Sequence, residues 1–230
     1  MAGPNFGAGG YFLSRPVIRD DDYMSTELLP PSFLSLSDCL TDSAFEYWWN
    51  EENAAEAAAE FGVGKRRLPD LIDWYRSRLG PELGAPNVAF STSVIYEFLR
   101  EFVDDPSGFV ILGCGLSEGH RIQLLENHEA PPDMGEYGVF EMLKDASVLE
   151  PGGQAMGFEI LSYQYGLEHS WLYNSLERVV ESQFGFRPNP TTGLLDSYDE
   201  AVEIAQFMNL GEIGAEPGTW FPWLVVQYQI

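Results

Sequence analysis

Positively charged side chains are scarce in this sequence. Its 230 residues contain 12 Lys and Arg against 36 Asp and Glu, which gives a formal net charge of −24 at pH 7. Only Lys65 and Lys144 are lysines, and no Lys or Arg follows Arg187. A chain with this charge is repelled by nucleic acids and anionic membranes and is attracted to basic proteins. The charge therefore argues against direct nucleic-acid binding and favours a basic protein partner.

Long apolar segments are also missing. The longest apolar runs, such as Phe109–Leu112 and Leu224–Val226, have the length of a strand, whereas a membrane helix needs about 20 residues. The first ten residues, MAGPNFGAGG, have neither the basic start nor the apolar centre of a secretory signal. We therefore expect a cytoplasmic protein that makes no membrane contact.

Residues that hold metals or cofactors are few and widely spaced. The chain has three histidines, His120, His128 and His169, and two cysteines, Cys39 and Cys114. It has no H-E-x-x-H, no C-x-x-C and no Gly-rich phosphate-binding motif. These absences predict no metal, no cofactor and no catalytic residues, and so a protein that is not an enzyme. We expect both cysteines to be buried thiols, because disulfides are rare in the cytoplasm.

Apolar and aromatic residues, in contrast, are plentiful. They make up 45% of the chain and include 15 Phe, 11 Tyr and 6 Trp, enough for a substantial core. Residues 1–32 are rich in Gly and Pro and contain three consecutive Asp, so we expect an acidic arm there. Residues 33–230 are predicted to form a single α+β domain. Its sheet is expected to be mixed or antiparallel, with about four to six strands and with helices packed on it.

Hydrophobic periodicity and capping signals divide that domain into elements. Strands are expected at 33–40, 108–116, 154–161, 193–196 and 219–230. Helices are expected at 42–61, 69–79, 92–103, 117–127, 137–144, 171–184 and 197–208. Ser197-Tyr198-Asp199-Glu200 matches a capping box, S-x-x-E, at the start of the last helix. Pro222 predicts an edge position or a bulge in the last strand.

The densest group of polar and aromatic side chains lies between 154 and 184. This stretch predicts a buried strand, a tight polar turn and a helix that begins near Trp171, with Ser170 as its cap. Glu159 sits among apolar residues of the strand, and if buried it needs a partner such as Arg121 or Arg187. A candidate pocket is predicted around the turn. It would comprise Tyr163, Tyr165, Glu168, His169, Trp171 and Asn174, together with Cys114.

Four segments of the second half carry a resemblance to known proteins. They are GFVILGCGLSEGHRIQLLENHE, GFEILSYQYGLEHSWLYNSLE, GLLDSYDEAVEIAQF and AEPGTWFPWLVVQY. Over Gly108–Ile230 the chain resembles a group of bacterial proteins of unassigned function. In size and acidity it is similar to immunity proteins, which neutralise polymorphic or contact-dependent toxins. The resemblance implies a protein that binds a toxin and carries over no catalytic roles.

Charge and resemblance together predict an acidic protein that occludes the active site of a basic toxin or effector, for example a nuclease. The acidic contact residues are expected to be Asp20, Asp21, Asp22, Glu212 and Glu216. One alternative is a small enzyme with its site at the Tyr163–Asn174 turn, where Glu168 or His169 would be the general base. A second alternative is a DNA mimic that inhibits a nucleic-acid-binding protein, which requires carboxylates spaced like phosphates.

Overall fold

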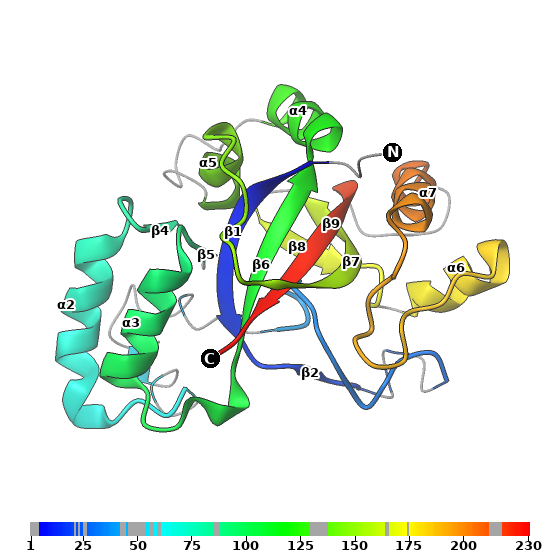
Figure 1. Ribbon diagram of the computed structural model, residues 1–230. Helices are drawn as coiled ribbons and strands as arrows, with labels where there is room; N and C mark the ends of the chain where they lie inside the picture. The colour runs from blue at the N-terminus through cyan, green and yellow to red at the C-terminus, as the bar shows by residue number, and fades with distance from the viewer. Residues whose placement is uncertain are drawn as a thin grey trace.

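A curled antiparallel sheet of seven strands forms the centre of the molecule (Figure 1). The computed structural model describes residues 5–20, 22, 24, 27–41, 45, 54–55, 58, 61–84, 88–128, 138–163, 166–173, 175–211 and 218–230. Helices pack around the sheet, which confirms the predicted α+β domain. In spatial order the strands are β4 (Leu83–Gly84), β5 (Val88–Ala89), β1 (Phe6–Ser14), β6 (Val110–Ser117), β9 (Thr219–Tyr228), β7 (Gln154–Tyr163) and β8 (Leu167–Ser170).

Strand β1 lies inside the sheet, between β5 and β6. Seven of its nine residues are buried. The expected acidic arm over residues 1–32 is therefore wrong for this segment. Its glycines, which we interpreted as loop signals, allow close packing: a Cβ on Gly9 would lie 2.7 Å from the Sγ of Cys114. Farther along, β2 (Val17–Ile18) pairs antiparallel with β3 (Ser32–Phe33), which begins at the last residue of the expected arm.

The three long strands β6, β9 and β7 were all predicted from the sequence, and β9 lies between the other two. The register of β9 has no bulge at Pro222, and β9 as a whole is interior, so the expected edge position holds only for this end of the strand. Pro222 lies opposite Ile160 of β7, and pairing with β6 ends at Leu116 and Trp223. Pro222 therefore lies beyond the ladder with β6, where a missing N–H costs no hydrogen bond to that strand.

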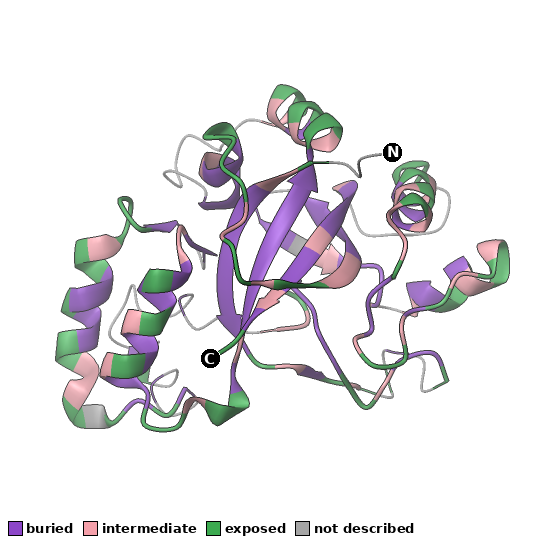
Figure 2. Ribbon diagram, in the orientation of Figure 1, coloured by how far each residue is buried: buried purple, intermediate pink, exposed green. Residues whose placement is uncertain are grey.

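Helices flank the sheet, with their apolar faces turned inward. In chain order they are the 3₁₀ turn η1 (Lys65–Arg67), α2 (Leu68–Arg78), α3 (Thr92–Phe102), the 3₁₀ turn η2 (Pro106–Gly108), α4 (Glu118–Asn127), α5 (Gly138–Lys144), α6 (Leu176–Phe184) and α7 (Tyr198–Asn209). α2 and α3 lie side by side at one end of the molecule (Figure 1). α4 and α7 lie near the C-terminal end of β6 (Figure 1). Figure 2 shows that burial is concentrated in the central strands, while the outward faces of the helices are exposed.

Three of the predicted elements are wrong. Residues 193–196, expected to form a strand, make only an isolated bridge between Leu195 and Phe158. Within the expected strand 33–40, only Phe33 belongs to a strand, and residues 34–37 are buried without regular pairing. The helix expected from Trp171 begins only at Leu176, because residues 167–170 form β8. Most of the helix expected over 42–61 lies outside the described residues. Within the described part of the chain, no helix is long and apolar enough to cross a membrane.

Candidate functional site

The stretch expected to form the candidate pocket continues the sheet, because β8 pairs antiparallel with β7. Tyr163 and Trp171 belong to the hydrophobic core, with 3% and 0% of their surface exposed. His169 is half-buried. The structure therefore places two of the predicted pocket residues inside the protein and one at its edge. Outside the described parts lie Tyr165, Asn174 and the side chain of Glu168.

The two cysteines differ in accessibility, contrary to the expectation that both are buried. Cys114 lies on β6 and is fully buried, and burial raises the pKa of its thiol far above the ordinary value. A thiol in that environment stays protonated and is a poor nucleophile, so Cys114 is a packing residue. Cys39 is exposed, and the two cysteines form no disulfide with each other.

A buried carboxylate on β7 organises the region around β8. Glu159 has no exposed surface and accepts three hydrogen bonds, two at Oε1 and one at Oε2. The donors are the hydroxyl groups of Ser35 (2.6 Å) and Ser170 (2.7 Å) and the backbone N–H of Leu36 (2.8 Å). We expected Arg121 or Arg187 to be its partner, and this expectation is wrong. Arg121 pairs with Glu118, and Arg187 pairs with Glu181. Burial raises the pKa of Glu159 to about 7, although the three donors act in the opposite direction.

Alternating serines connect this carboxylate to Cys39. The hydroxyl of Ser35 accepts a hydrogen bond from the N–H of Ser37, and the hydroxyl of Ser37 accepts one from the N–H of Cys39. On the β8 side, the N–H of His169 donates to the hydroxyl of Ser162. Ser35 and Ser37 each satisfy a backbone donor two residues later, as Ser residues do in tight turns, whereas Ser162 satisfies one on the neighbouring strand β8. The segment 35–39 and the strand β8 are thereby held beside each other.

The two segments bring a thiol and an imidazole together. The Sγ of Cys39 lies 3.2 Å from the Nδ1 of His169. The pair was not predicted, because the two residues are 130 positions apart in the chain. The alternation Ser35-Leu36-Ser37-Asp38-Cys39 is the local signal of a hydrogen-bonded turn, but no sequence pattern names the histidine across it.

A second polar cluster lies between α4 and α7. The hydroxyl of Tyr198 donates to the Oγ of Ser117 over 2.7 Å, and that Oγ lies 3.0 Å from the Nδ1 of His120. Burial lowers the pKa of His120, which favours the neutral form of its ring. Ser117 was expected to cap α4. It occupies the N-cap position, but its hydroxyl contacts His120 and Tyr198 and makes no capping hydrogen bond.

These three side chains form part of the wall of an open cleft of about 670 Å³. Its rim carries two carboxylates, Glu118 and Asp199. Glu118 is engaged by Arg121 through two hydrogen bonds of 2.8 Å, which lower its pKa. Asp199 is exposed and forms no ion pair within the described part of the chain. A neutral polar wall with an unpaired carboxylate at the rim suits a cationic side chain. The other lining residues are Asn5, Gly119, Gln123 and Val202.

Only part of the expected acidic contact group can be placed. Asp20 and Asp22 are exposed, and the carboxylate of Asp20 accepts a hydrogen bond from the N–H of Asp22. Outside the described residues lie Asp21, Glu212 and Glu216. Since Asp20 and Asp22 point their charge at solvent, they stay candidates for contact with a basic partner.

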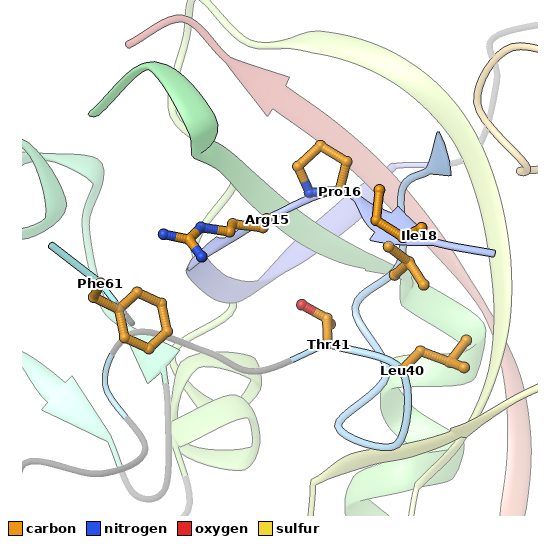
Figure 3. Close-up of a pocket in the computed structure, with 7 residues that line it drawn as sticks. Arg15, Pro16, Ile18, Leu40, Thr41 and Phe61 are labelled. Atoms are coloured by element: carbon orange, nitrogen blue, oxygen red, sulfur yellow. The ribbon is translucent and has the colours of Figure 1, made fainter. Parts of the chain in front are cut away.

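A smaller hollow of about 160 Å³ lies where β2 meets the segment after Cys39. Figure 3 shows Arg15, Ile18, Thr41 and Phe61 around it, from three separate parts of the chain. The guanidinium of Arg15 lies 4.8 Å from the centre of the Phe109 ring. Because that cation is stacked on an aromatic ring, it holds the end of β1 against the core. Pro16, Val17 and Leu40 complete the lining.

Comparison of the chain with protein-family models, with curated proteins and with solved structures found no match.

Proposed function

We propose that this chain binds a basic protein and neutralises it, in the manner of an immunity protein that occludes a toxin. The observation that carries the proposal is the distribution of charge along α7 and the segments around it. After Arg187 the chain has six acidic residues and no Lys or Arg: Asp196, Asp199, Glu200, Glu203, Glu212 and Glu216. A region without any internal cation keeps its full negative field for a partner.

The surface of α7 supports this proposal. Asp199 and Glu203 lie one turn apart in the helix and are both exposed. Neither forms an ion pair within the described residues. A single exposed ion pair contributes less than about 1 kcal/mol, so such a surface acts mainly as a group. Grouped carboxylates accelerate association with a basic partner by about 10-fold to 1,000-fold at low salt.

The cleft beside α7 supplies the specific part of the contact. We infer that a Lys or Arg side chain of the partner enters it, approaches Asp199 and meets the neutral hydroxyl and imidazole groups of Tyr198, Ser117 and His120. Burial of one such cation by this surface would remove it from the partner's own site. If that site binds a polyanion, the carboxylates of α7 occupy the place of the substrate.

The test compares two matched charge reversals. Asp199→Lys with Glu203→Lys alters α7, and Asp70→Lys with Asp73→Lys makes the same change on α2, where both carboxylates are exposed. Each double variant raises the net charge by four, and each places one reversal in the first turn of its helix. We expect the wild type and the α2 variant to capture the same basic protein from the source cells, in a salt-sensitive manner. The α7 variant should lose it.

Neutralisation is then measured with the captured partner in purified form. We expect its activity to fall with added wild-type protein to a one-to-one end point, and to be unaffected by the α7 variant. Equal loss of binding in both double variants would show that net charge alone determines binding, and would refute a specific role of α7. Retained binding in the α7 variant would refute the assignment to α7, and binding without loss of the partner's activity would refute neutralisation.

The alternatives from the sequence stay predictions. A small enzyme at the Tyr163–Asn174 turn would use Glu168 or His169 as its general base, while Tyr163 and Trp171 are buried in the core. A DNA mimic would be displaced from its partner by duplex DNA, and the same captured protein provides that test.

A further inference from the structure

Cys39 is the accessible thiol of this chain, and a base lies beside it. Its Sγ is 3.2 Å from the Nδ1 of His169, within reach of a proton transfer between sulfur and nitrogen. The other cysteine, Cys114, is fully buried. A thiol next to an imidazole is ionised more readily than an isolated surface thiol, because the imidazolium stabilises the thiolate.

The interior behind this pair is unusually polar. The described part of the chain has nine buried polar or charged residues, and five of them lie in the hydrogen-bonded network that supports Cys39 and His169. A buried polar network is costly unless every member is bonded, and when bonded it holds its surroundings in one geometry. Here it fixes both backbone segments that carry the pair. The five residues are Ser35, Ser37, Glu159, Ser162 and Ser170.

The geometry selects among the reactions of a thiolate. Acyl transfer needs N–H donors aimed at the developing oxyanion. The N–H groups that follow the turn are already used: that of Cys39 donates to the hydroxyl of Ser37, and those of Leu40 and Thr41 donate to the carbonyl of Ser37. Thiol–disulfide exchange needs only an accessible thiolate and a proton acceptor.

We propose that Cys39 is a site of reversible S-thiolation by small disulfides, with His169 as its base. The imidazole takes the thiol proton, and the thiolate attacks one sulfur of the disulfide. A new S–S bond forms to Cys39 while the original S–S bond breaks, and the departing thiolate takes the proton back from His169. The disulfide supplies the oxidising equivalents, so atoms and electrons balance.

The product stays a mixed disulfide, because the chain offers no second accessible thiol to displace the adduct. Cys114, the other cysteine, is enclosed on β6. The negative field of the protein favours neutral or cationic disulfides over anionic ones. The site is therefore one of modification, reversed by an external thiol, and it is independent of the proposed partner surface on α7.

The experiment uses the folded full-length protein, in reduced form, with cystamine as the disulfide probe. Intact-mass measurements follow the rate of adduct formation between pH 6 and 9 in wild type, His169→Gln, Cys39→Ser and Cys114→Ala. We expect a single adduct on Cys39, which forms at pH 6.5 about tenfold faster in wild type than in His169→Gln. The difference should shrink toward pH 9, where an unassisted thiol also ionises.

A merely structural effect of His169 is distinguished in the same measurement. A variant that fails to fold exposes Cys114 and takes up a second adduct, and in denaturant wild type and His169→Gln should react at equal rates. Cys114→Ala should react like wild type, and Cys39→Ser should not react. Equal rates for folded wild type and His169→Gln throughout the pH range would overturn the proposal, as would a first adduct on Cys114.

Discussion

Replacement of Glu159 by Gln tests the energetic role of the buried carboxylate. An amide keeps one oxygen that can accept from the hydroxyl groups of Ser35 and Ser170. Its NH₂ group, however, faces the N–H of Leu36, which donates to Oε2 over 2.8 Å in the wild type. The loss of that hydrogen bond should lower the free energy of unfolding by about 1–3 kcal/mol, and the pH-dependent contribution of the carboxylate adds to this difference.

The pH dependence carries the sharper prediction. Burial raises the pKa of Glu159 from 4.5 to about 7 in the folded protein. Because the pKa of Glu159 is higher in the folded than in the unfolded protein, protonation of Glu159 stabilises the folded state. This stabilisation is complete below about pH 4.5 and is lost as the pH rises through about 7. Each unit of pKa corresponds to about 1.4 kcal/mol, so the whole effect is about 3 kcal/mol, of which about 2 kcal/mol falls between pH 5.5 and 8.5.

The assay is urea unfolding of wild type and Glu159→Gln from pH 5.5 to 8.5, with Glu126→Gln as the control. Glu126 is exposed on α4, so its replacement removes the same charge without touching the network. We expect the unfolding free energy of wild type, relative to Glu159→Gln, to fall by about 2 kcal/mol across this range. The difference between wild type and Glu126→Gln should stay nearly constant. A constant difference for Glu159→Gln as well would refute the raised pKa.

Two further substitutions test the packing of β1 and the start of α7. Gly9→Ala puts a Cβ 2.7 Å from the Sγ of Cys114 and 3.1 Å from the ring of Trp223. It should lower the free energy of unfolding by about 1–3 kcal/mol, measured as a lower melting temperature. Adding Cys114→Ala should recover part of that loss, and a fully additive double variant would contradict the proposed clash. Ser197→Ala removes the hydroxyl that accepts from the N–H of Glu200 and should cost about 1 kcal/mol in chemical unfolding, whereas Ser197→Asp, which can still cap, should cost less. An Asp variant no more stable than the Ala variant would show that the cap contributes nothing.

Local patterns predicted the elements whose signals are periodic. The strands at 110–117, 154–163 and 219–228 and the helices α2, α3, α4 and α7 follow from apolar spacing and from turn residues at their ends. The capping hydroxyl of Ser197 was also predicted, because the S-x-x-E pattern acts within four residues. In these elements the side chains that decide the structure are neighbours in the chain.

Other elements depend on what surrounds them. The Gly-rich segment 6–14 is a central strand because Cys114 and Trp223 leave no room for a side chain at Gly9. The segment after β7 forms β8, and the helix begins only at Leu176. The hydroxyl of Ser170 donates to Glu159, so it is not used to cap the helix. Neither influence is local, so neither could be predicted from propensity.

By itself, the sequence determined the charge of −24, the absence of basic residues after Arg187, the apolar content of the core and the α+β class, because these follow from composition and local periodicity. Only the tertiary structure decided which polar groups meet. It placed Cys39 against His169, and Tyr198 against Ser117 and His120, across separations of 130, 81 and 78 residues. Such contacts arise when the sheet brings distant segments into register, and register is set by the packing of the whole core.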